Sequence, residues 1–312
     1  MNRFAVPADT LDDLTEGSCT DWKGVRMSDP HQALVVPNVV YGHRQEVPLS
    51  FDVYRPRHAN GAAVLFINSG GFVSGQLVQY TATGQSEWRV LEPHELTVQG
   101  AEPPIPLLEQ FSFSGLLARG FTVFDVRHSN HPPSTLDQMV EDVHGAARFI
   151  LEHVTEYGVD ASRIGLWGAS AGAYLALQLG LAFDGDAFAA ISTYYPAGHD
   201  FVDAVGRFPE IAAALPALDI AAEVLDALGL KHHIKRDAPP ILIVYGTDDM
   251  PFITETCEAL CAELQESGNA VNCLAIPGTG HEFRGEDGYH EEHGSRANAE
   301  MVSWFVRHLH VS

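Results

Sequence analysis

Residues 164–177, IGLWGASAGAYLAL, decide the fold of this 312-residue chain. The apolar run Ile164 to Trp167 is typical of a buried strand, and the small apolar residues after Ser170 are typical of a buried helix. Gly168 and Gly172 stand two residues to either side of the serine, where a sharp strand-to-helix turn leaves no room for larger side chains. This G-x-S-x-G arrangement predicts a nucleophile elbow, in which Ser170 Oγ is exposed for nucleophilic attack.

Strand-like and helix-like segments alternate on both sides of this elbow. The expected strands are Val35–Tyr41, Leu49–Tyr54, Ala62–Asn68, Phe121–Val126, Phe188–Tyr195, Pro240–Tyr245 and Val271–Ile276. The expected helices, besides the one at Ser170, are Leu136–Val154, Ile253–Ser267 and Arg296–His310. The first of these has a capping box at Ser134 and Asp137 and a C-cap at Gly158. The alternation predicts an α/β fold with a mainly parallel central sheet, helices on both faces and a site at the carboxyl ends of the strands.

We expect a single domain at residues 35–312, preceded by a polar, acidic N-terminal arm at residues 1–34. Two stretches interrupt the alternation. Residues 76–108 contain a candidate hairpin at Arg89 to Val98, and residues 197–236 are alanine-rich and helix-prone. Loops of this length inside a compact domain are usually functional or disordered. We interpret both as cap or lid insertions over the site.

The composition, 46% apolar and 19% charged, is that of a globular protein with a sizeable core. A formal charge of −23 repels phosphate backbones and anionic lipid surfaces, so no nucleic-acid partner is expected. The charge is compatible with high solubility or with adaptation to salt. Residues 164–183 are uncharged over the length of a membrane span, but a buried strand, turn and helix explain them better. The N-terminal sequence MNRFAVPADTLDDL has no signal-peptide core, so we expect a cytoplasmic protein, and the sequence leaves open whether it forms a homodimer.

The four cysteines, Cys19, Cys257, Cys261 and Cys273, are too few for a disulfide scaffold in a chain of this length. Cys257 and Cys261 lie four residues apart on one apolar helical face, which favours free thiols in the core. A bridge between Cys257 and Cys273 is the alternative.

A serine hydroxyl is a weak nucleophile near neutral pH and needs an adjacent base. Among the sixteen histidines, His281 stands in the glycine-rich segment PGTGHEF directly after the last expected strand, from where it can reach back over the sheet edge. His290 and His293, in the sequence HEEH, lack the spacing and helical context of a zinc site. We expect a solvated acidic loop there.

The base needs a carboxylate that holds its tautomer and stabilises its cation. Asp248 and Asp249 both follow the next-to-last expected strand, and either completes the chain order Ser, Asp, His of such sites. Negative charge that develops on a substrate oxygen needs backbone N–H donors. Ala171, after the serine, and Gly70 and Gly71, after an early apolar strand, are the candidate donors of an oxyanion hole.

With these residues assembled, the chain from about residue 35 onward resembles the hormone-sensitive-lipase-like and feruloyl-esterase-like carboxylesterases of the α/β-hydrolase superfamily. Residues 68–71, NSGG, align with their His-Gly-Gly-Gly, and residues 124–127, FDVR, resemble their Asp-Tyr-Arg segment. In this family the acid is often the third residue after the glycine of its loop, which selects Asp249. The family's histidine is Asn68 here, and an asparagine can still brace the loop by hydrogen bonds.

The resemblance implies an α/β-hydrolase fold and hydrolysis of small-molecule carboxylic esters, without a metal or organic cofactor. It implies these roles: Ser170 as nucleophile, His281 as base, Asp249 as the acid that orients the base, and Gly70, Gly71 and Ala171 as oxyanion donors. An amidase or exopeptidase on the same residues, and a non-catalytic ligand-binding protein on a hydrolase scaffold, are the alternatives. Phe72, Trp88, Tyr194 and Tyr195 are candidates for a substrate pocket and, equally, for packing.

Overall fold

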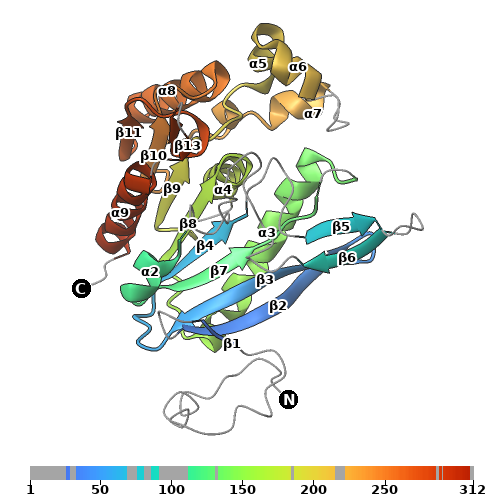
Figure 1. The fold of residues 1–312 in the computed structure, drawn as a ribbon, viewed down its shortest axis with the longest axis vertical. Helices are drawn as coiled ribbons and strands as arrows, with labels where there is room; N and C mark the ends of the chain where they lie inside the picture. Colours follow the sequence, from blue (N-terminus) through green and yellow to red (C-terminus); the bar gives the residue numbers. More distant parts are fainter. Residues whose placement is uncertain are drawn as a thin grey trace, which may run out of the picture.

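The computed structural model describes residues 26–28, 33–68, 76–80, 86–90, 112–130, 133–183, 186–214, 222–285, 288–289 and 291–309. Within them a nine-stranded sheet has the order β1-β2-β3-β7-β4-β8-β9-β10-β11 (Figure 1). These strands are β1 (Arg26–Ser28), β2 (Ala33–Arg44), β3 (Val47–Pro56), β4 (Ala63–Ile67), β7 (Thr122–Val126), β8 (Ile164–Ala169), β9 (Ala190–Tyr194), β10 (Ile241–Gly246) and β11 (Val271–Ile276). Pairing is antiparallel from β1 to β7 and parallel from β7 to β11. The predicted α/β fold with a mainly parallel sheet is confirmed.

The chain changes direction within the sheet at β4. From this central strand it passes first to β7 on one side and then to β8 on the other. The loops after β4 and β8 therefore leave the same edge of the sheet side by side. Such a switch point is where sites in open α/β sheets are found. Asn68 follows β4 and Ser170 follows β8, so the topology alone brings two predicted parts of the site together.

Helices cover both faces of the sheet. The described helices are α2 (Ser114–Ala118), α3 (Leu136–His153), α4 (Ala171–Ala182), α5 (Phe201–Arg207), α6 (Pro209–Ala214), α7 (Ala222–Ala227), α8 (Pro251–Glu266) and α9 (Glu291–His308), of which α5, α6 and α7 lie beyond the end of the sheet (Figure 1). A Cβ on Gly165 of β8 would lie 2.4 Å from the ring of Phe305 in α9. The next residue, Leu166, lies against Gly180 of α4. Because successive strand residues point to opposite faces, α9 and α4 cover opposite faces, and the apolar strands between them are buried throughout.

Residues 164–183 form β8, the turn at Ser170 and α4, as predicted. Every residue of α4 from Ala171 to Leu181 is buried, which explains why this stretch carries no charge. In the part of the chain that the structure describes, no helix is long and apolar enough to cross a bilayer.

Helix α3 starts at Leu136 as predicted, but its N-cap lies one residue later than predicted. Its N-cap is Thr135, whose N–H donates to Oε1 of Gln138 (3.1 Å) in a capping box. The predicted cap, Ser134, is buried, and its N–H donates instead to the carbonyl oxygen of Asn130 (3.0 Å). Helix α3 ends at His153 and is followed by a 3-10 helix, Val154–Tyr157. The predicted C-cap, Gly158, ends this 3-10 helix in a left-handed conformation, with φ 68°.

Both predicted insertions contain regular structure where they are described. Residues 197–236 carry α5, α6 and α7, in accord with their helix-prone sequence. In residues 76–108, β5 (Gln76–Tyr80) and β6 (Ser86–Val90) form an antiparallel hairpin. Of the expected hairpin at Arg89 to Val98, Arg89 and Val90 belong to β6, and the other residues lie outside the described residues. A role of either insertion as a lid stays a prediction.

The sheet begins earlier in the chain than predicted. Strand β1 pairs with β2, with Arg26 opposite Val35. Five residues of the segment predicted as an N-terminal arm, residues 1–34, therefore join the sheet, three in β1 and the first two of β2. Residues 1–25 and 29–32 lie outside the described residues.

Helix α9 begins at Glu291, before the predicted start at Arg296. His293 therefore lies in a helix and not in the expected loop, whereas His290 lies outside the described residues. The polar first turn, EEHGS, has no apolar periodicity from which a helix could be predicted. Across the described ranges, no group of three or more His, Cys, Asp or Glu side chains could hold a metal ion.

The prediction of free core thiols is confirmed for Cys257 and wrong for Cys261, and the alternative bridge between Cys257 and Cys273 is wrong. Cys261 of α8 and Cys273 of β11 form a disulfide, and Cys257 is a free, buried thiol whose pKa is raised well above its ordinary value by burial. Helix α8 packs on β10 and β11, so one helical turn places Cys261, and not Cys257, against the edge strand. Cys19 lies outside the described residues.

Candidate active site

Ser170 lies at the turn between β8 and α4, with φ 51° and ψ −120°. This conformation is strained for a residue with a side chain, and such strain concentrates at functional sites. A Cβ on Gly168 would lie 2.2 Å from the carbonyl oxygen of Gly172, and a Cβ on Gly172 would lie 2.3 Å from that of Ile67. Close backbone contacts therefore require both glycines of the predicted elbow.

The side chains of Ser170, His281 and Asp249 meet in one hydrogen-bonded row. His281 Nε2 lies 3.1 Å from Ser170 Oγ, and His281 Nδ1 lies 3.1 Å and 3.0 Å from the two carboxylate oxygens of Asp249. With Nδ1–H donating to the carboxylate, Nε2 is left to accept the serine proton. The Asp249 side chain is fully buried, and its Oδ1 also accepts from the N–H of Met250 (2.7 Å). The row has the geometry of a nucleophile, a base and an orienting acid.

The neighbouring carboxylate is placed differently. Asp248 is exposed, and its Oδ1 accepts a hydrogen bond from Thr247 Oγ1 (2.7 Å). Its backbone N–H donates to the carbonyl oxygen of Thr279 (2.9 Å). Asp248 thus joins the loop after β10 to the loop that carries His281, and Asp249 is the aspartate beside the imidazole.

The loops after β10 and β11 approach each other closely. A Cβ on Gly246 would lie 2.1 Å from the carbonyl oxygen of Thr279, so only glycine fits at the end of β10. Gly278 N–H donates to Thr247 Oγ1 (3.0 Å), and Gly280 N–H donates to the carbonyl oxygen of Arg284 (2.6 Å). These contacts clamp the segment on both sides of the imidazole and keep it over the sheet edge.

Of the three predicted oxyanion donors, the structure describes one. Ala171 is the first residue of α4, so its N–H belongs to the helix N-terminus, where aligned peptide dipoles place partial positive charge. Gly70 and Gly71 lie outside the described residues. Their part in an oxyanion hole stays a prediction.

Asn68, directly after β4, is held by hydrogen bonds to β7. Its N–H donates to the carbonyl oxygen of Val126 (3.0 Å), and its Nδ2 donates to Asp125 Oδ1 (3.3 Å). Burial raises the pKa of Asp125 to about 6, against the opposing effect of the nearby Arg127 guanidinium. The asparagine thus braces the start of its loop, as expected.

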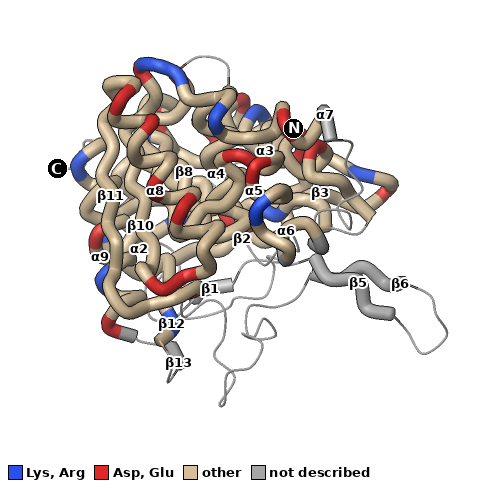
Figure 2. The backbone as a smooth tube through the Cα atoms, turned by 90° about the horizontal axis from the view of Figure 1, so that it is seen from above, with Lys and Arg blue, Asp and Glu red and all other residues tan. Residues whose placement is uncertain are grey.

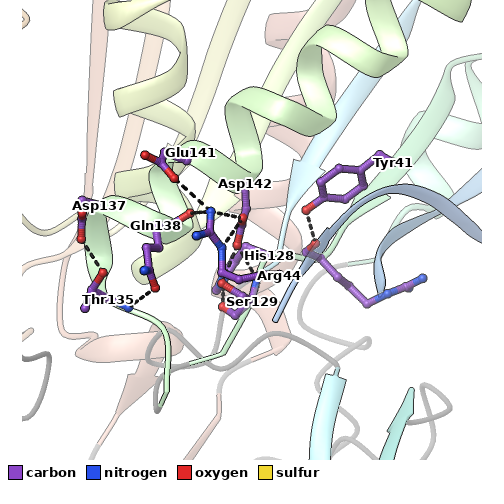
Figure 3. Close-up of polar contacts among 10 residues, drawn as sticks. Tyr41, Arg44, His128, Ser129, Thr135, Asp137, Gln138, Glu141 and Asp142 are labelled. Carbon is purple, nitrogen blue, oxygen red and sulfur yellow. Dashed lines mark hydrogen bonds and ion pairs between the residues drawn. The ribbon is translucent and has the colours of Figure 1, made fainter. Parts of the chain in front are cut away.

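A second polar network joins β2, α3 and the segment after β7 (Figure 3). Arg44 Nε, at the end of β2, donates to Asp142 Oδ1 of α3 (2.8 Å), and Asp142 Oδ2 accepts from Ser129 N–H (3.0 Å). His128 Nδ1 lies 2.6 Å from the carbonyl oxygen of Ser129, and burial lowers the pKa of its imidazole. The network holds the segment after β7. The sequence does not single out Arg44 or Ser129, because they meet from distant parts of the chain.

The four residues considered for a substrate pocket have different surroundings. Tyr194 and Tyr195 are 0% and 1% exposed, which favours the packing alternative. The ring of Tyr195 lies against His281, with 4.5 Å between ring centroids. Trp88 belongs to β6, and Phe72 lies outside the described residues, so their place in a pocket stays a prediction.

Sequence comparison finds relatives that are named as esterases. The BD-FAE family model matches residues 108–205, which include the elbow. The probable isoprenylcysteine alpha-carbonyl methylesterase ICMEL1 of Arabidopsis thaliana is 23% identical over 270 residues, covering 78% of this chain and 50% of that protein. Esterase LipC of Mycobacterium tuberculosis is 28% identical over 221 residues, covering 64% and 53%. The chain thus spans about half the length of the curated relatives it matches.

Solved structures share the fold over most of the chain. Thermogutta terrifontis esterase 2 phosphorylated by paraoxon has a TM-score of 0.65 at 19% identity, covering 90% of this chain and 95% of that one. A truncated carbohydrate esterase from gut microbiota also has a TM-score of 0.65, at 17% identity, covering 88% and 96%.

Strand order, elbow and structural likeness together show that this chain belongs to the fold class of the α/β hydrolases. Within that class, the BD-FAE match and the names of its relatives confirm its predicted resemblance to the feruloyl-esterase-like and hormone-sensitive-lipase-like esterases.

Proposed function

We propose that this protein is a serine carboxylesterase that hydrolyses small-molecule esters through an acyl-enzyme on Ser170. The observation that carries the proposal is the row of hydrogen bonds from Ser170 Oγ through the His281 imidazole to the buried Asp249 carboxylate. A serine needs such a base to become a nucleophile, and the base needs such an acid to hold its tautomer.

The reaction has two halves. Ser170 Oγ attacks the ester carbonyl while His281 Nε2 takes its proton, and the imidazolium is stabilised by Asp249. His281 then gives the proton to the leaving alcohol, and the acyl group stays on Ser170 Oγ. Water activated by His281 attacks the acyl-enzyme, releases the carboxylic acid and restores the serine hydroxyl.

The oxyanion of each tetrahedral intermediate needs preorganised donors. Ala171 N–H at the N-terminus of α4 is one, and Gly70 and Gly71 N–H after β4 are proposed as the others. Each such donor contributes about 3 kcal/mol to lowering the barrier. The brace of Asn68 on Asp125 supports this assignment, because it holds the start of the loop beside the elbow.

The substrate class is proposed from the relatives. Their names include a methylesterase and, in Salmonella, an acetyl esterase. A small acyl group is therefore the first choice for an assay, with a feruloyl ester as a bulky comparison.

The test is turnover of p-nitrophenyl esters of rising acyl length by the wild type, Ser170→Ala and Ser162→Ala. Ser162 is an exposed serine eight residues before Ser170, at the opposite end of β8, and serves as the matched control. We expect Ser170→Ala to lose roughly 10⁴-fold or more in kcat and Ser162→Ala to match the wild type. Near-normal turnover by Ser170→Ala would overturn the mechanism.

Two further assays separate the alternatives. Paraoxon, which phosphorylates the Thermogutta esterase, should inactivate the wild type and add its phosphoryl group to the peptide with Ser170. Aminoacyl p-nitroanilides should be poor substrates, and turnover of these amides faster than of the esters would favour an amidase. Failure of every ester and of paraoxon would favour a non-catalytic binding protein.

A further inference from the structure

The corner at the end of β9, formed by Tyr194 and Tyr195, contacts both Ser170 and His281 of the candidate site. Tyr194 is the last residue of β9, and its carbonyl oxygen accepts a hydrogen bond from the N–H of Ser170 (2.9 Å). The next side chain, Tyr195, lies with its ring 4.5 Å from the imidazole of His281, at an interplanar angle of 55°. One corner thus contacts the elbow through its backbone and the base through a ring.

The conformation of this corner is strained. Tyr195 has φ 41°, a left-handed conformation that is uncommon for an aromatic residue. Such a conformation is unfavourable and persists only where the surroundings hold it. Here Tyr195 N–H donates to the carbonyl oxygen of Val244 (2.7 Å), and the thiol of Cys257 lies 3.8 Å from the carbonyl oxygen of Pro196 as a weak donor.

The ring of Tyr195, which packs on the His281 imidazole, belongs to a larger aromatic cluster. Phe283 lies 5.2 Å from the ring of Tyr195 and 5.4 Å from the ring of Tyr194. The hydroxyl of Tyr194 donates to Asn298 Oδ1 in α9 (2.9 Å), which anchors the cluster to the terminal helix. Tyr195 is 1% exposed, so its ring is held in place by the core.

Resting on the proposed function, we infer that Tyr195 is a positioning residue for His281. Asp249 holds the imidazole at Nδ1, but a hydrogen bond at one edge leaves the ring free to pivot about it. The Tyr195 ring blocks that movement on the buried side and keeps Nε2 at 3.1 Å from Ser170 Oγ. The electron-rich face of a tyrosine also attracts the imidazolium that forms when the serine proton is transferred.

The test is a split between kcat and KM on a p-nitrophenyl ester. Tyr195→Leu removes the ring and should lower kcat by roughly 10- to 100-fold, because small misplacements of reacting groups have effects of this size. KM should change little, since the ring is buried and does not contact substrate. Tyr195→Phe keeps the ring and should restore kcat to near the wild-type value. The rate of inactivation by paraoxon should fall in parallel with kcat.

A matched control separates positioning from stability. Tyr157 is also a buried tyrosine in an aromatic cluster, with 5.1 Å between its ring centroid and that of Phe124 in β7, which lies on the other side of β4 from the elbow strand β8. Tyr157→Leu should lower the melting temperature without lowering kcat at a temperature where all variants are folded. Tyr195→Met, a milder substitution, repeats the test if Tyr195→Leu does not fold.

Two outcomes have distinct meanings. If Tyr195→Leu or Tyr195→Met retains the kcat of Tyr157→Leu while Ser170→Ala is inactive, the positioning role is wrong and the proposed function stands. If Ser170→Ala retains activity, the proposed function itself fails, whatever the Tyr195 variants do.

Discussion

Asp248 and Asp249 are adjacent in the chain, but only Asp249 is buried against the imidazole. Asp249→Asn keeps the shape of the side chain and removes the charge that stabilises the imidazolium, so kcat should fall on the order of 10³- to 10⁴-fold. Asp248→Asn changes an exposed carboxylate of the same loop and should leave kcat close to wild type. Steady-state hydrolysis of one p-nitrophenyl ester by both variants checks this. Equal losses would contradict the role of Asp249.

The buried carboxyl of Asp125 makes stability depend on pH. Its pKa rises from 3.8 to about 6 on folding, because burial disfavours its charge. Between these values the folded state binds more protons than the unfolded state. The stabilising contribution of the neutral carboxyl is therefore complete below about pH 4 and is lost as pH rises through about 6.

Asp125→Asn removes this titration and keeps an oxygen that can accept from Asn68. Relative to the wild type, the free energy of unfolding of the variant should increase by up to about 3 kcal/mol between pH 4 and pH 7. Urea unfolding of both proteins at several pH values in this interval measures the difference. A difference that stays constant with pH would show that burial does not raise this pKa.

Among the elements, α8 and β11 frame the loops that carry the acid and the base. Helix α8 begins shortly after Asp249, and β11 ends shortly before His281. The disulfide between Cys261 and Cys273 joins these two elements across a sequence separation of 12 residues. It therefore restrains the helix that follows Asp249 and the strand that precedes His281, and with them the edge of the sheet.

Reduction of this disulfide should lower stability. Closing a loop of this length contributes about 3 kcal/mol through the unfolded state, which corresponds to a fall in melting temperature of roughly 5–10 °C. Thermal unfolding with and without dithiothreitol checks the value. The double variant Cys261→Ala, Cys273→Ala is the control and should melt at the same lower temperature in both buffers. An unchanged melting temperature of fully reduced wild type would contradict the prediction.

At the scale of the whole molecule, the charge is strongly unbalanced. The 41 acidic residues exceed the 18 basic ones by 23, and Figure 2 shows acidic positions in several elements, including α5 and α8. Like charges distributed over one compact body repel one another and destabilise it. Stability should therefore respond to ionic strength.

Raising the salt concentration from about 0.01 M to about 0.15 M shortens the Debye length from about 30 Å to about 8 Å. At pH 7.5 this step should raise the melting temperature, since it screens the repulsion. The same step near pH 5, close to the sequence pI of about 4.9, serves as the control and should have a much smaller effect. A melting temperature that falls with salt at pH 7.5 would show that screened ion pairs outweigh the net repulsion.

Local patterns predicted most elements of the fold. Apolar runs located the central strands, and the glycines around Ser170 located the elbow, because both depend on neighbouring residues alone. The predicted cap or bounds of an element were wrong where two neighbouring residues could both form the cap, or where the sequence has no apolar periodicity. The cap of α3 moved from Ser134 to Thr135, and the polar first turn of α9 was not predicted.

The amino-acid sequence by itself determined the class of fold, the strained serine turn and the order of the candidate reacting residues along the chain. Burial periodicity and backbone geometry are local properties, so they can be predicted from neighbouring residues. Only the tertiary structure decided that Asp249 meets His281, that Cys261 pairs with Cys273 and that Tyr195 packs on the imidazole. These contacts join residues that are distant in the chain, and the order of strands in the sheet sets the distances between them.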